Sequence, residues 1–152
     1  MNKGMKKASR RQFLKSASGA VAAFTIVPRH VLGQGQTPPS EKLSIAGIGA
    51  GGMGGSDINA VAEGNNIIAL CDVDLRRAST IEKYPEAKVY RDFRKMFDEM
   101  ADQIDAVIVG TPDHTHAVAA MAAIKRGKHV YCEKPLAHSV AEVRALMKAA
   151  QE

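Results

Sequence analysis

The feature that most constrains this fold is a regular alternation, from residue 42 onward, of short apolar runs with segments of helical period. Such alternation is typical of βα units wound around a parallel sheet. The run at 106–109, Ala-Val-Ile-Val, is apolar at every position, as expected of a strand covered by helices on both faces. We therefore predict an α/β fold with a doubly wound parallel sheet.

The expected strands are 43–48, 66–71, 88–90, 105–109 and 129–132, and the expected helices lie near 53–63, 74–84, 92–101, 115–126 and 139–151. Three helix ends support this division. Gly64 and Gly127 are placed where a left-handed C-terminal cap is needed, and Ser139 precedes Glu142 by three residues, the spacing of a capping box.

A glycine-rich loop directly follows the first expected strand. Two registers of the motif G-x-G-x-x-G fit, one beginning at Gly47 and one at Gly49. We prefer the second, because the strand should continue through the residue before Gly49. In this register Gly49 makes the tight turn, Gly51 lets the backbone approach a pyrophosphate, and Gly54 lets the helix pack closely on the strand.

A dinucleotide would bind where this loop opens into its helix. The helix N-terminus, with the amides around Gly52 and Met53, offers unpaired N–H groups and a partial positive charge to phosphates. Asp72 follows Gly54 by 18 residues, at the end of the second strand. A carboxylate there accepts hydrogen bonds from the adenosine ribose and repels a 2′-phosphate. These features predict a Rossmann domain that prefers NAD to NADP.

Two arginines leave NADP open as the alternative cofactor. Arg76 and Arg77 follow Asp72 closely, and either side chain is long enough to meet a 2′-phosphate. We expect both instead on the solvated face of the helix 74–84, with Asp74 as its N-cap rather than as a second ribose ligand.

The second half of the chain carries a family resemblance. The sequence GTPDHTH at 110–116 and the sequence GKHVYCEKP at 127–135 together resemble the paired signature of the Gfo/Idh/MocA oxidoreductases. The resemblance extends over 42–152. In this fold the glycine loop, the turn at 111–112 and the turn at 133–135 all leave strand ends at one sheet edge, so one dinucleotide can touch all three.

The resemblance implies roles for individual residues. Lys134 is expected to be catalytic, reaching the nicotinamide and the substrate carbinol. Glu133 would orient this lysine or contact the nicotinamide ribose, Pro135 would fix the turn, and His116 would lie near the cofactor. The expected cofactor-binding residues are Gly49, Gly51, Gly52, Met53, Gly54, Asp72, Thr111, Pro112, His116, Glu133, Lys134 and Pro135.

No metal site and no disulfide framework are expected. His114, His129 and His138 lack cysteines or acids at metal-ligand spacing, so we expect them to face solvent or lie at strand ends. Cys71 and Cys132 end predicted strands, where a small buried residue is the usual occupant.

The first 33 residues resemble a twin-arginine signal peptide. They hold seven of the 21 Lys and Arg residues and no acid, and they place Arg10-Arg11 just before a weakly apolar segment. A basic amphipathic arm and a membrane anchor are the alternatives, but an anchor needs about 20 continuous apolar residues. We expect export to the periplasm or beyond by the twin-arginine machinery, with membrane contact only during export.

The rest of the chain divides into a linker, 34–41, and the Rossmann domain, 42–152. Without the signal, 14 basic residues face 16 acidic ones, so the high isoelectric point gives no support to nucleic-acid binding. The resemblance implies a later α+β substrate domain with a catalytic acid and a histidine. The chain is therefore expected to be incomplete at its C-terminus and inactive alone.

Three functions remain open for the full-length protein, which we expect to be a homo-oligomer. The first is an oxidoreductase acting on a sugar, inositol or related polyol with NAD. The second is an NAD-dependent glycoside hydrolase of the same fold, a branch that tends to depart from Glu-Lys-Pro. The third is a non-catalytic dinucleotide-binding protein.

Overall fold

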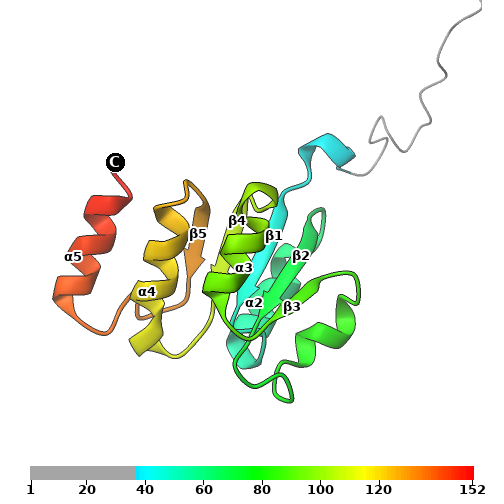
Figure 1. Cartoon of the computed structure of the whole chain (residues 1–152), viewed down its shortest axis with the longest axis horizontal. Helices are drawn as coiled ribbons and strands as arrows, with labels where there is room; N and C mark the ends of the chain where they lie inside the picture. Colours follow the sequence, from blue (N-terminus) through cyan, green and yellow to red (C-terminus); the bar gives the residue numbers. More distant parts are fainter. Residues whose placement is uncertain (1–36) are drawn as a thin grey trace, which may run out of the picture. The chain divides into compact units, whose positions relative to one another are not determined.

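The computed structural model describes residues 37–152, and the predicted signal peptide lies outside the described residues. The unit Pro39–Glu152 contains one sheet whose neighbouring strands are all parallel, in the order β3-β2-β1-β4-β5 (Figure 1). The strands are β1 (Ser44–Ile48), β2 (Asn66–Cys71), β3 (Lys88–Tyr90), β4 (Ala106–Val109) and β5 (His129–Cys132). The predicted doubly wound parallel sheet is confirmed, and the strand order reverses between β1 and β4.

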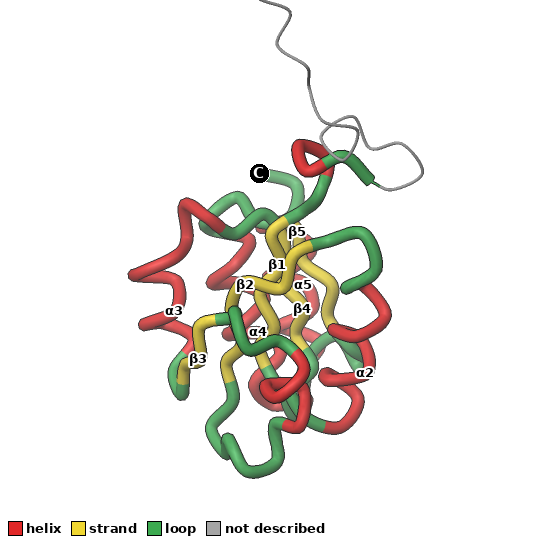
Figure 2. The backbone as a smooth tube through the Cα atoms, turned by 90° about the vertical axis from the view of Figure 1, so that its right-hand side faces the viewer, coloured by secondary structure: helices red, strands yellow, loops and turns green. Residues whose placement is uncertain are grey.

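Helices cover both faces of this sheet. They are α2 (Gly52–Val61), α3 (Phe93–Met100), α4 (Asp113–Ile124) and α5 (Val140–Ala149), with short 3-10 helices η1 (Pro39–Glu41), η2 (Ser79–Lys83) and η3 (Ala101–Gln103). In Figure 2, α2 and α3 lie on opposite sides of the strands. None of the helices within residues 37–152 has the length and apolarity needed to span a bilayer.

The alternating side chains of β1 build the two core layers. Ala46 and Ile48 face the layer that contains Phe97 of α3, whereas Ile45 faces the layer that contains Ile58 of α2. Because successive side chains of a strand point to opposite faces, an apolar strand of this kind must be covered on both sides. The ends of β1 and β4 are thereby held at the middle of the sheet.

The predicted helix ends are confirmed. Gly64 and Gly127 have φ angles of 81° and 68°, the left-handed region that glycine adopts without steric cost. The Ser139 hydroxyl accepts from the amide of Glu142 at 3.3 Å, and the Glu142 carboxylate accepts from the amide of Ser139 at 2.9 Å. This reciprocal pair is the predicted capping box of α5.

The predicted helix at 74–84 is wrong. The segment forms turns followed by the short 3-10 helix η2. The Asp72 carboxylate accepts from the amide of Asp74 at 2.9 Å, and the Asp74 carboxylate accepts from the amide of Arg76 at 3.2 Å. Aspartate side chains that satisfy nearby amides compete with helical hydrogen bonds. Asp74 therefore caps a turn and not a helix.

Candidate functional site

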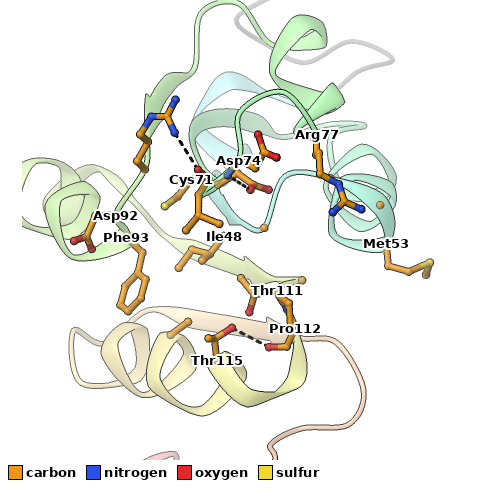
Figure 3. Close-up of a pocket in the computed structure, with 18 of the residues that line it drawn as sticks. Ile48, Met53, Cys71, Asp74, Arg77, Asp92, Phe93, Thr111, Pro112 and Thr115 are labelled. Atoms are coloured by element: carbon orange, nitrogen blue, oxygen red, sulfur yellow. Dashed lines mark hydrogen bonds between the residues drawn. The ribbon is translucent and has the colours of Figure 1, made fainter.

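A cleft of about 750 Å³ opens at the carboxyl edge of the sheet, where the strand order reverses between β1 and β4. In open α/β sheets ligands bind at this position. Figure 3 shows Phe93 at one end of the cleft and Met53 and Arg77 at the other. The predicted site residues that line it are Gly49, Gly51, Gly52, Met53, Asp72, Thr111 and Pro112.

The glycine loop is packed tightly against the turn that follows β4. Gly49 has a φ of 87°, and a Cβ added there would lie 2.7 Å from backbone atoms of Gly110. A Cβ at Gly54 would collide with the Gly49 carbonyl and lie 3.0 Å from the Cα of Gly110. The roles predicted for the first and third glycines, a tight turn and close helix packing, agree with this geometry.

Gly51 has a neighbour that the motif does not predict. A Cβ at Gly51 would lie 2.5 Å from the carbonyl oxygen of Arg77, on the loop after β2. The expected reason for this glycine was access of a pyrophosphate to the backbone. The structure adds a second reason, because the glycine lets the Arg77 backbone approach the phosphate loop.

The N-terminus of α2 is open to an anion. Gly51 is its N-cap, no side chain caps it, and its first turn contains no acid. In addition, the hydroxyl of Thr111, which lines the cleft, is buried and has no hydrogen-bond partner among the described residues. Free amides suit a pyrophosphate, and a buried unpaired hydroxyl is costly unless a ligand binds it. The cleft therefore fits a dinucleotide.

Asp72 connects the glycine loop after β1 to the loop after β2. One carboxylate oxygen accepts from the amide of Ala50 at 2.9 Å, and the other accepts from the amide of Asp74 at 2.9 Å. An ionised carboxylate has about four acceptor positions, so capacity for ribose hydroxyls remains. Asp72 thus fixes the glycine loop as well as facing the cleft.

Arg76 and Arg77, the two arginines that make NADP an alternative cofactor, differ in their surroundings. The guanidinium of Arg76 pairs with Asp74 at 2.9 Å, and this hydrogen bond lowers the pKa of the Asp74 carboxyl. Arg77 lines the cleft, and its side chain makes no hydrogen bond with any residue in 37–152. Both were expected on the face of a helix that does not form.

The far end of the cleft contains residues that the sequence interpretation missed. Phe93 and Arg94 begin α3 and line the cleft, and Arg91 donates to the carbonyl of Val73 at 3.0 Å. Hydrogen bonds from Arg94 lower the pKa of Asp92, the N-cap of α3, to about 2. The Asp-x-Arg pattern at the start of the amphipathic segment 93–100 was the signal that could have identified this end.

The turn at 133–135 lies at the same sheet edge but does not line the cleft. The amide of Glu133 donates to the carbonyl of Val109 at 2.9 Å, so the turn leaves β5 beside the end of β4. Lys134 is exposed and precedes Pro135 through a cis peptide bond. Glu133 accepts from the hydroxyl of Tyr131 at 3.2 Å.

A second carboxylate lies near Glu133. Asp57 on α2 has one buried oxygen without a partner among residues 37–152, and burial together with the charge of Glu133 raises the pKa of this carboxyl. Glu133 therefore accepts from Tyr131 and acts on Asp57 through its charge, and the described contacts include none between its carboxylate and Lys134.

His116 is buried beneath the cleft rather than lining it. The residue is 2% exposed, and its ring has Nε2 2.6 Å from the carbonyl oxygen of Thr111 and Nδ1 2.7 Å from that of Pro135. It thus joins the turn after β4 to the turn after β5. The resemblance placed this histidine near the cofactor, and the structure places it one layer below.

The other histidines and the cysteines show no ligand cluster. His129 and His138 are exposed, whereas the exposed His114 lies on the cleft wall. Within residues 37–152, no group of three or more His, Cys, Asp or Glu side chains is arranged to hold a metal ion. Both cysteines are free, and burial is the main cause that raises the thiol pKa to about 12 for Cys71 and about 11 for Cys132.

Residues 43–152 match the family model described as an oxidoreductase family with an NAD-binding Rossmann fold. An inositol 2-dehydrogenase of Rubrobacter xylanophilus is 35% identical over 117 residues, 74% of this chain and 33% of that protein. A glycosyl hydrolase family 109 protein of Solibacter usitatus is 32% identical over 163 aligned residues, 97% of this chain and 37% of that protein.

The solved structures agree with this match. An NAD-binding oxidoreductase from Klebsiella pneumoniae is 34% identical and superposes with a TM-score of 0.58 over 72% of this chain and 32% of its own. The chain thus spans about a third of the length of the curated relatives it matches. The chain belongs to the Gfo/Idh/MocA oxidoreductase family, of which it carries the NAD-binding Rossmann domain.

Proposed function

We propose that this chain is the cofactor-binding part of a dehydrogenase that oxidises or reduces a sugar, inositol or related polyol. The observation that carries the proposal is the bond from the Glu133 amide to the Val109 carbonyl. It holds the Lys134 turn beside the Thr111 turn, so a dinucleotide in the cleft can extend its nicotinamide toward the lysine. The similarity to inositol 2-dehydrogenases supports the polyol as substrate.

Each group of residues has a distinct part in this proposal. NAD supplies the hydride acceptor or donor when it is bound. The open amides of α2 bind its pyrophosphate, and Asp72 accepts from its adenosine ribose. Lys134 polarises the substrate oxygen through its ammonium, or takes part in moving the carbinol proton. We expect the acid and histidine of the family's substrate domain to complete the site.

Cofactor preference tests the role of Asp72. We expect Asp72→Ser to weaken NAD binding by about 1.5 to 3 kcal/mol, the usual value of hydrogen bonds to a charged acceptor. We also expect it to narrow the difference in affinity between NAD and NADP. The narrowing follows because repulsion of the 2′-phosphate is lost. Calorimetric titration of parent and variant with both cofactors measures this.

A second variant separates the role of Asp72 in the loop from its charge. Asp72→Asn retains one oxygen acceptor for the backbone amides, so it should preserve more of the fold. Because its side chain is neutral, it should no longer repel the 2′-phosphate of NADP. Equal affinities of the parent for NAD and NADP would contradict the assignment and would point to Arg77, which lines the cleft.

The glycoside hydrolase is a second candidate, favoured by the relative whose similarity covers 97% of this chain. The intact Glu133-Lys134-Pro135 triplet favours the dehydrogenase. The full-length protein distinguishes them, because a dehydrogenase accumulates NADH in proportion to the polyol it oxidises. A hydrolase of this type releases the aglycone from a chromogenic glycoside without accumulating NADH, since its oxidation of the sugar is transient.

We also propose that the protein is exported by the twin-arginine route. The paired Arg10-Arg11 and the weakly apolar segment after them support this. Changing both arginines to lysine keeps the charge but removes the recognised pair, so unprocessed precursor should accumulate in the cytoplasm. Immunoblots of cell fractions measure this, and unchanged processing of the double variant would refute the proposal.

A further inference from the structure

One face of α2 lies against a distant part of the chain. Gly51 at its N-cap, Gly55 and Asn59 follow one another at intervals of four residues, so they form a row along one face of the helix. The segment 77–84, which includes η2 and follows Asp72 in the chain, runs along this row. The helix that presents its open amides to the cleft is thus in contact with the loop after β2.

Gly55 and Asn59 each make a close contact with this segment. A Cβ added to Gly55 would lie 2.5 Å from the hydroxyl oxygen of Thr80, and the hydroxyl of Tyr84 donates to the side-chain carbonyl of Asn59 at 3.0 Å. Thr80 is 1% exposed and Gly55 is buried, so neither can move aside into solvent. The contacts occur in the same order along both elements, so the segment is aligned with the helix.

The dinucleotide motif gives no reason for Gly55, because its three glycines are Gly49, Gly51 and Gly54. A glycine within a helix costs about 1 kcal/mol relative to alanine. Gly55 does not line the cleft, so it gives a ligand no access to the backbone. The close approach of Thr80 accounts for the glycine, and an alanine there would displace the docked segment.

The two elements joined by this contact hold the two ends of the ADP half of NAD. The phosphate amides belong to the start of α2, and Asp72, the proposed ribose acceptor, lies on the loop that leads into the segment 77–84. A ligand that engages both parts binds tightly only when their separation matches its own, because the second contact is then made within the complex. Binding to either part alone does not depend on that separation.

We propose that Gly55 and Thr80 are positioning residues, which dock the segment 77–84 on α2 and thereby set the separation between Asp72 and the amides of the phosphate helix. Neither residue lines the cleft. The Asp72 bond to the Ala50 amide fixes the near end of the loop, and the docked segment fixes its far end. The positioning role rests on the proposed roles of Asp72 and of the α2 amides.

Fragments of the cofactor test this separation. Gly55→Ala should weaken ADP binding by roughly tenfold, the effect of modest overpacking, because ADP must reach both parts. Adenosine reaches only Asp72 and inorganic pyrophosphate reaches only the α2 amides, so each should bind within about twofold of its affinity for the parent. Nuclear magnetic resonance titrations of the whole chain, followed through the amide signals of Asp72 and Met53, measure all three ligands.

A size exchange identifies the contact responsible. When Gly55→Ala is combined with Thr80→Ala, the hydroxyl that would meet the new Cβ is gone, so ADP affinity should recover to within about threefold of the parent. The recovery is incomplete because the same Cβ would lie 3.1 Å from the Ala50 carbonyl oxygen. Ser56→Ala is the matched control, because Ser56 is the exposed neighbour of Gly55 on α2, and its ADP affinity should equal that of the parent.

Three outcomes would each overturn the positioning role: parental ADP affinity in Gly55→Ala, equal losses for all three ligands, or no recovery in the double variant. If Gly55→Ala fails to fold, Tyr84→Phe takes its place. Loss of the hydroxyl bound to Asn59 should weaken ADP binding by about threefold and leave adenosine and pyrophosphate unchanged, and parental ADP binding in this variant would overturn the role.

The proposed roles of the two half-sites are checked in the parent alone. Adenosine should shift the amide signal of Asp72, and pyrophosphate should shift that of Met53. Failure of both shifts would refute the roles of Asp72 and of the α2 amides, and with them the positioning role. A loss of ADP affinity in Gly55→Ala without these parental shifts would therefore not support the inference.

Discussion

Replacing Lys134 by alanine is expected to lower kcat of the full-length enzyme by roughly 100-fold or more, the usual contribution of a group that assists proton transfer. Lys134 is exposed at the carboxyl edge of the sheet, on the turn that the Glu133 amide fixes beside β4. An ammonium there stabilises negative charge on the substrate oxygen mainly in the transition state. The loss should therefore appear in kcat, with NAD affinity nearly unchanged.

A structural lysine would behave differently. Its removal would lower the melting temperature or the affinity for NAD, and turnover of the folded, NAD-saturated fraction would remain near that of the parent. Lys125→Ala is the matched control, because Lys125 is also exposed but follows α4 away from the cleft. Near-parental turnover of folded Lys134→Ala would disprove the catalytic assignment.

The strands and most helices could be predicted because their signals are local. Ala106 to Val109 is apolar throughout, and a strand of that composition must be covered on both faces. Glycine at 127 and the Ser139–Glu142 pair mark helix ends through the chemistry of their own backbone. Such features depend on a few neighbouring residues, so the sequence alone determines them.

The segment 74–84 shows where local reasoning fails. Its composition suits a helix, but Asp72 and Asp74 bind the amides that a helix would use, and the Arg77 carbonyl packs against Gly51. The last contact joins residues 26 positions apart and depends on the paths of both loops. The error also misplaced Arg77, which lines the cleft.

His116 shows the same limit within the site. A motif identifies the residue type and its approximate place, but the two carbonyls that its ring meets belong to Thr111 and Pro135, on separate turns. The pairing becomes visible only when β4 and β5 are adjacent. The link that the ring makes between the two turns is therefore a property of the folded chain.

Gly51→Ala should weaken NAD binding by roughly 10- to 100-fold, because overpacking of a close contact typically costs about 1 to 3 kcal/mol. The new Cβ would lie 2.5 Å from the carbonyl oxygen of Arg77, which is backbone and has no rotamer to escape into. The loop 72–78 must therefore move. Because Asp72 bonds the amide of Ala50, that movement displaces the ribose acceptor and the phosphate loop together.

A second glycine provides the control for general destabilisation. Gly47→Ala would crowd Ile58 in the core between β1 and α2, at a position that does not line the cleft. It should lower the melting temperature while the folded fraction keeps parental NAD affinity. Met53→Ala, which removes an exposed side chain and keeps the amide, should change affinity little. Parental NAD affinity in Gly51→Ala would show that neither the contact with the Arg77 carbonyl nor close approach of the pyrophosphate requires a glycine at this position.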